Sequence, residues 1–130
     1  SYRSAFSDVQ RKAHEERARA LLKEADGAHQ LGDYRDALRL YEEALHYRPF
    51  DAELSHKTGR LAWKLGSDLR KAKDCAMAAC ELAPDNAGYR KTLGQIYKAA
   101  GLIANAKREL QTALRLDPSD AESRQELKTL

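Results

Sequence analysis

The chain has 130 residues, of which 33% are charged and 7% aromatic, and its net charge is +3. This composition favours helix over strand, and so small a net charge does not by itself indicate a nucleic-acid-binding protein. No apolar run approaches the roughly 18 residues that span a bilayer, and no signal-peptide core opens the chain, so we expect no association with membranes.

The first predicted element is a long N-terminal helix. Ser7 and Gln10 form a capping-box pattern, Asp8 suits the positive end of a helix, and a long stretch without glycine or proline follows. We therefore expect a helix over about residues 8–31. Residues 1–17 are expected to be an N-terminal extension of this first helix, mostly charged, which projects into solvent or leads to an upstream domain. The chain does not begin with methionine, and we expect it to be a domain of a larger protein.

From residue 31 onward the sequence repeats itself. The stretch LGDYRDALRLYEEALHYRP contains a glycine, an amphipathic run and a closing proline, and the same order occurs twice more. The prolines are 35 and 34 residues apart, and the landmarks are Gly32, Pro49, Gly66, Pro84, Gly101 and Pro118. Glycine ends a helix in the left-handed conformation and proline cannot continue one, so each unit predicts a helix, a turn and a second helix.

This period divides the chain into three helix pairs and a final helix. The pairs are expected at about 18–31 with 34–47, 52–65 with 69–82, and 87–100 with 104–116. We assign the repeats to residues 18–51, 52–86 and 87–120, and residues 121–130 to a capping helix. Small residues recur where paired helices must approach closely, namely at Ala25, Gly59, Gly94, Ala37, Ala72, Ala106, Ala44, Ala79 and Ala113. Larger residues such as Leu31, Leu82 and Leu110 are expected to fill the spaces between them.

At these positions the sequence resembles the tetratricopeptide repeat family, most plainly in GDYRDALRLYEEALHYRP and LGQIYKAAGLIANAKRELQTALRLDP. The resemblance covers about residues 18–130 and implies an all-α fold, a right-handed α-solenoid of stacked antiparallel helix pairs. It also implies a scaffold or adaptor domain for protein–protein interaction. Two features depart from the pattern: the second turn has one extra residue, and Glu24 and Thr58 stand where an apolar residue is usual.

No catalytic or metal-binding pattern stands out. The four histidines lie on different predicted helices without the spacing of metal ligands, and no glycine-rich phosphate loop is present. Cys75 and Cys80 point about 140° apart on one helix, so they cannot easily form a disulfide. We expect no enzyme activity, no metal and no cofactor, and two buried thiols typical of a reducing, cytoplasmic compartment.

The first helices of the second and third repeats carry six cations against one acid, Glu53. In the family these helices line a concave face, and a cleft of one charge sign concentrates a ligand of the opposite sign. We therefore hypothesise that an extended, acidic peptide binds there. The candidate site residues are His56, Lys57, Arg60, Trp63, Lys64, Lys91, Gln95 and Lys98. The alternatives are a merely solvated charged face and a Trp63 that packs between repeats.

One subclass of the family grips the C-terminal carboxylates of chaperones with a clamp of basic and amide side chains. The corresponding positions here hold Leu22, Asp26, Lys57, Gly88 and Thr92. Only one of them is basic, so we expect no carboxylate clamp and do not assume Hsp70 or Hsp90 tails as ligands. Two other functions stay open: self-association into a homo-oligomer, and binding of nucleic acid, which related helical repeats perform but which the low net charge disfavours.

Overall fold

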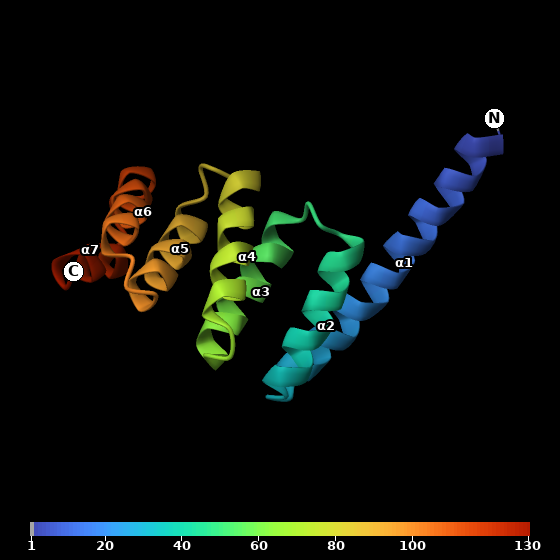
Figure 1. Ribbon diagram of the computed structural model, residues 1–130, viewed down its shortest axis with the longest axis horizontal. Coiled ribbons are helices and arrows are strands. Elements are labelled where there is room, and N and C mark those ends of the chain that lie inside the picture. Colours follow the sequence, from blue (N-terminus) through green and yellow to red (C-terminus); the bar gives the residue numbers. More distant parts are fainter. Residues whose placement is uncertain (1) are drawn as a thin grey trace. The chain divides into compact units, whose positions relative to one another are not determined.

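The structure, a computed structural model, describes residues 2–130 and their side chains from residue 7 onward. All regular secondary structure in this range is α-helical (Figure 1). The helices are α1 (Tyr2–Gln30), α2 (Tyr34–Tyr47), α3 (Ala52–Leu65), α4 (Leu69–Leu82), α5 (Ala87–Ala99), α6 (Ile103–Leu116) and α7 (Ala121–Lys128). The chain is thus an all-α helical-repeat protein of the solenoid class, as the sequence predicted.

The helices form two compact units, Ser1–Asp51 and Ala52–Leu130. In the first unit α1 and α2 pack side by side, and α1 extends beyond the end of α2 (Figure 1). In the second unit α3 pairs with α4 and α5 with α6, α4 also contacts α5, and α7 packs on α6. The bounds of α2 to α6 lie within one residue of the predicted ones.

Glycines make the turns between paired helices, and a side-chain cap is added at the second turn. Gly32, Gly66 and Gly101 have φ values of 82°, 66° and 77°, the left-handed conformation that a side chain would strain. The second turn accommodates its extra residue because Asp68 caps α4 and accepts a hydrogen bond from the Lys71 N–H at 3.0 Å. The longer turn therefore leaves the helix pair intact.

The paired helices meet at small residues. All nine small residues predicted at these contacts are buried. A Cβ atom added to Gly59 would lie 3.0 Å from the Ala72 carbonyl oxygen and 3.0 Å from the Ala76 nitrogen, both in the backbone of α4. A Cβ added to Gly94 would lie 2.8 Å from the Leu110 side chain. The close approach leaves no space for a larger residue at either position.

Thr58 is a polar residue in the helix packing whose hydroxyl group has a hydrogen-bond partner. Thr58 is fully buried at one of the positions that depart from the repeat pattern, and its hydroxyl donates to the Leu54 carbonyl oxygen at 2.7 Å. The hydroxyl thus replaces an apolar group without leaving an unpaired polar atom.

Cys80 is buried, and burial raises the pKa of its thiol to about 11. Cys75 is only half-buried, so the prediction of two buried thiols is right for one of them.

Several local predictions were wrong. Helix α1 begins at Tyr2 and passes through Ser7, so Ser7 is not the N-cap of the first helix. The capping-box pattern is a local signal, and the residues before it continue the helix. Leu31 and Leu82 were expected in the core but are 81% and 40% exposed. Leu31 follows the last residue of α1 and Leu82 is the last residue of α4, where fewer neighbours surround a side chain.

The contact at Gly59 predicts a test of the packing. Gly59→Ala should destabilise the protein by about 1–3 kcal/mol, because α3 and α4 must separate to admit the methyl group. Gly27→Ala is the matched control: it also lies in a helix, but its added Cβ meets nothing within 4 Å. That change should be neutral or stabilising by up to about 1 kcal/mol. Chemical denaturation measures both, and equal stabilities of the two variants would contradict the packing argument.

Candidate interaction surface

Five of the eight predicted site residues lie on one side of α3. At about 100° per residue they fall within an arc of about 120°, and they are His56, Lys57, Arg60, Trp63 and Lys64. The other three, on α5, fall within about 60° of one another and are Lys91, Gln95 and Lys98. The structure therefore gives each set one face of its helix.

His56 joins the two helices. A hydrogen bond of 2.9 Å links His56 Nε2 to Thr92 Oγ1, and the imidazole stacks on the Tyr89 ring with centroids 4.5 Å apart. Burial lowers the pKa of His56, and the nearby Arg60 charge lowers it further. A neutral ring held by two residues of α5 is a structural link between the repeats, not an open ligand-binding group.

Lys91 and Gln95 hold carboxylates that belong to the chain itself. The Glu122 carboxylate of α7 accepts from Lys91 Nζ at 3.2 Å and from Gln95 Nε2 at 2.9 Å. Lys91 Nζ also lies 3.6 Å from an Asp120 oxygen. Both donors lower the pKa of Glu122, with the hydrogen bond from Lys91 as the largest cause.

Lys98 is held by α7 in the same way. Its Nζ atom lies 2.9 Å from a Glu126 carboxylate oxygen and donates to Thr129 Oγ1 at 2.7 Å. Every predicted site residue on α5 therefore binds a polar side chain at the C-terminal end of the chain. The sequence reasoning missed Glu122 and Glu126 because it counted charge on the first helices alone.

Helix α7 is fixed for this contact by its own N-terminus. The Asp120 carboxylate accepts the N–H groups of Glu122 and Ser123 at 3.1 and 3.3 Å, and Oδ2 accepts the Ser123 hydroxyl at 2.7 Å. Burial alone would raise the pKa of Asp120, but the bonds from Ser123 and the charge of Lys91 outweigh it and the pKa is lowered. The cap thus orients the turn that carries Glu122.

Two of the accessible cations of the second unit lie on α3 beside Trp63. Arg60 and Lys64 are exposed, and neither forms a salt bridge with a carboxylate of the side chains described from residue 7 onward. Lys64 Nζ lies 4.9 Å from the centroid of the half-buried Trp63 ring, a cation–π contact. Two cations and the edge of an indole therefore share one accessible face.

The positions of the carboxylate clamp carry other side chains with other contacts. Asp26 accepts a hydrogen bond from the Tyr41 hydroxyl at 2.5 Å, and Thr92 is 4% exposed and bonded to His56. Gly88 offers no side chain. Of the positions compared, two belong to the first unit and three to the second. In the second unit only Lys57 is basic, and neither Gly88 nor Thr92 can bind a terminal carboxylate as an arginine would.

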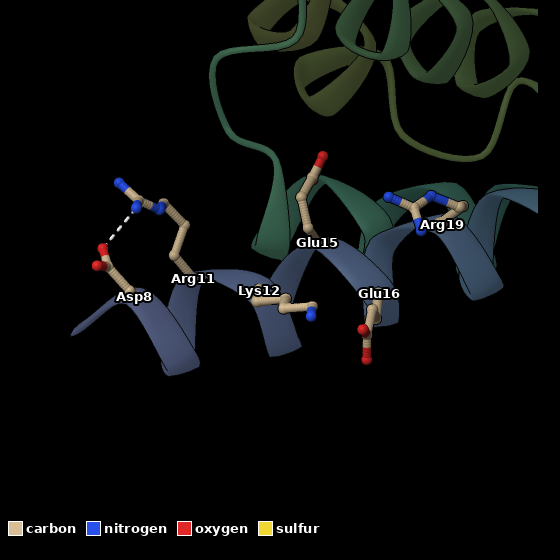
Figure 2. A pocket seen from close by; sticks show the side chains of 6 residues that line it. All are labelled: Asp8, Arg11, Lys12, Glu15, Glu16 and Arg19. Carbon is tan, nitrogen blue, oxygen red and sulfur yellow. Dashed lines mark hydrogen bonds and ion pairs between the residues drawn. The ribbon is translucent and has the colours of Figure 1, made fainter. Parts of the chain in front are cut away.

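A hollow on α1 is lined only by charged side chains, as Figure 2 shows. Its lining residues are Asp8, Arg11, Lys12, Glu15, Glu16 and Arg19. Arg11 pairs with Asp8 at 2.5 Å, and Glu15 pairs with Arg48, the C-cap residue of α2, at 2.8 Å. Both charge signs alternate and no apolar side chain lines it, so it lacks the features of a small-molecule site.

Among the side chains described, no group of three or more His, Cys, Asp or Glu residues is arranged to hold a metal ion. No described helix combines the length and apolarity needed to cross a membrane.

Stacked antiparallel helix pairs with glycine turns and small residues at the contacts define a helical-repeat protein. A family model described as tetratricopeptide repeat matches residues 22–87, and a second with the same description matches residues 92–120. The chain therefore belongs to the tetratricopeptide repeat family. The bounds of its individual repeats stay a prediction. No curated protein matched the chain by sequence.

Solved structures with this fold come from several different proteins. The first TPR of Spaghetti (RPAP3) bound to HSP90 peptide SRMEEVD is 19% identical to this chain, with a TM-score of 0.79. The match covers 88% of this chain and 90% of that one. The Arabidopsis OM64 TPR domain is 16% identical with a TM-score of 0.80, and coverage is 89% and 95%. MamA from Desulfovibrio magneticus RS-1 is 24% identical with a TM-score of 0.78, and coverage is 85% and 62%. At these identities the likeness concerns the fold.

The pKa shift of Asp120 predicts how its contacts respond to pH. A carboxylate whose folded pKa lies below its unfolded value of about 4 stabilises the protein above that pH. This stabilisation is lost as the pH falls through the folded pKa. Asp120→Asn keeps a capping oxygen but removes the charge, so it should cost about 1 kcal/mol at pH 7. The cost should shrink as the pH falls below about 4 and through the folded pKa of Asp120.

Chemical denaturation at pH 7, 5 and 3 measures this difference. Glu81→Gln is the control, since it removes an exposed carboxylate of α4 far along the chain from α7. It should differ little from the unmodified protein at any of the three pH values. A cost of Asp120→Asn that is the same at pH 7 and pH 3 would contradict the assignment of the stabilisation to the charge.

Proposed function

We propose that this domain is a non-catalytic protein-interaction module that binds an acidic segment of a partner protein on the α3 face. Arg60 and Lys64 pair with carboxylates of the partner, and Trp63 contacts an apolar side chain between them. The observation that carries the proposal is that these two cations are exposed and unneutralised in the second unit, beside the only tryptophan of the chain.

The arrangement on α5 supports an acidic partner. Lys91, Gln95 and Lys98 already bind carboxylates of α7 in the geometry that an acidic ligand would use. These α5 side chains therefore bind carboxylates through hydrogen bonds of 2.9–3.2 Å, and those from the lysines are charge-assisted. We place the primary contact of the partner on α3. The α5 side chains form a second part of the binding surface, which becomes available when the carboxylates of α7 release them.

The membership in the family favours protein binding over catalysis. RPAP3, which has the same fold, was solved with a bound peptide whose sequence, SRMEEVD, contains three acidic residues. The clamp positions of this chain differ in chemistry, so we propose a different acidic segment for it. We place the protein in the cytoplasm, where two free cysteines are compatible with the reducing conditions.

Trp63 reports directly on the proposed site. We expect its emission to shift in a saturable and salt-sensitive manner when a peptide from an acidic peptide library binds. Arg60→Glu should weaken that binding by about tenfold or more, because it replaces attraction by repulsion at the contact. Arg70→Glu on α4 is the matched control, an exposed arginine with the same change of net charge. Equal losses in the two variants would mean that net charge, and not this face, attracts the peptide.

The α7 contacts generate a second prediction. Glu122→Gln combined with Glu126→Gln removes the charges that neutralise Lys91 and Lys98, so binding of the same acidic peptide should strengthen several-fold. Lys128→Gln, on the opposite side of α7, is the control and should leave the affinity within about twofold. Titration followed through Trp63 measures both. An unchanged affinity in the double variant would exclude the α5 side chains from the binding surface.

A further inference from the structure

The outer face of α6 carries cations that have no acidic partner. At about 100° per residue five of its exposed side chains lie within an arc of about 100°, and they are Ala104, Lys107, Arg108, Gln111 and Arg115. The exposed Ile103 lies about 40° outside this arc. None of the three cations forms a salt bridge with the side chains described from residue 7 onward. The one acid of α6, Glu109, faces inward, where it pairs with Arg90 at 3.0 Å and is only 14% exposed.

This face repeats a pattern that already holds two carboxylates of a helix elsewhere in the chain. On α5 the order is cation, glutamine and cation at Lys91, Gln95 and Lys98, with spacings of four and three residues. On α6 the order is again cation, glutamine and cation, at Arg108, Gln111 and Arg115, with spacings of three and four. In each set the two cations are seven positions apart and the three side chains span about 60° of the helix. The second pattern is therefore the first one read in the opposite chain direction.

The groups that bind to the α5 pattern belong to the same chain. They are the carboxylates of Glu122 and Glu126, which lie one turn apart on one side of the α7 helix. Glu122 is shared by Lys91 and Gln95, and Glu126 pairs with Lys98. Two carboxylates at positions i and i+4 therefore satisfy a cation–glutamine–cation set on a neighbouring helix.

We propose that the outer face of α6 docks an acidic helix of a partner protein, with glutamate or aspartate at positions i and i+4. Arg108 and Arg115 bind the two carboxylates, Gln111 shares one of them, and Lys107 lies at the edge of the contact. Because the α6 pattern runs in the reverse order, the partner helix lies along α6 with the opposite polarity to that of α7 along α5. Arginine in place of lysine adds bidentate bonds to each carboxylate.

The surface differs in place and in ligand from the one proposed on α3. It lies on a second helix of a pair, it has no aromatic anchor, and its chemistry suits a helical ligand, not an extended one. Binding at α6 requires none of the α7 contacts to open. The two surfaces can thus be separated by substitution, because they share no residue.

The test uses the full chain and a synthetic alanine-rich helical peptide with glutamates at positions i, i+4 and i+8. The control peptide has the same composition, with its glutamates at positions i, i+5 and i+10, so that successive carboxylates lie about 140° apart around the helix. Calorimetry at low ionic strength should show binding of the first peptide. Arg108→Glu with Arg115→Glu should weaken it by about tenfold or more, whereas Arg60→Glu with Lys64→Glu, of equal charge change, should weaken it less than about threefold.

Amide chemical shifts of the unmodified chain provide a readout that does not depend on the folding of a variant. The changes caused by the first peptide should fall on residues 107–115. Changes on α3 or α5 instead, equal binding of the control peptide, equal losses in the two double variants or no detectable binding would each overturn the proposal. So would a dimer of the peptide-free chain that is lost in the α6 variant, since it would assign the face to a second copy. A single-stranded RNA that displaces the peptide from α6 with a steep salt dependence would assign the face to nucleic acid.

Discussion

The close approach of paired helices at small residues is the constraint on which the rest of the structure depends. Gly59 and Gly94 are each the eighth residue of a first helix, and a methyl group would press on the α4 backbone at Gly59 and on the Leu110 side chain at Gly94. Alanines face them from α4 and α6. Because backbones that nearly touch bury small side chains efficiently, a core with few large residues suffices to hold each pair together.

This packing leaves the outer faces of the helices to charged residues, and their distribution determines what the surface can bind. In α7 the charges are segregated: Glu122 and Glu126 lie on one side, and Arg124 and Lys128 point in nearly the opposite direction. The acidic side meets the lysines of α5. The cations of α5 are thus neutralised within the chain, whereas those of α3 and α6 are exposed to solvent.

The repeat period of the sequence predicted the fold because each repeat has several residues, at fixed places, that restrict where helices begin, end and pack. Glycine, proline and small residues at matching places each exclude most alternatives, and together they gave helix bounds within one residue for α2 to α6. A signal from only a few neighbouring residues was misleading at Ser7, where the capping-box pattern lies inside a continuous helix. The candidate site could be predicted only in part. The repeat placed Lys91 and Lys98 on one face, but the rotation of α7 that brings Glu122 and Glu126 to them depends on the Asp120 cap and on packing.

The eighth residue of α7 shows why this helix acts through charge and not through pairing. In α3 and α5 that position is glycine, but in α7 it is the exposed Lys128. An added Cβ at Gly94 would come within 2.8 Å of Leu110, so the close contact of α5 with α6 depends on glycine, and Lys128 of α7 does not reproduce it. Instead, α7 is held by its packing on α6 and by its carboxylates on α5. The same carboxylates set the number of basic side chains on this surface that a partner can reach.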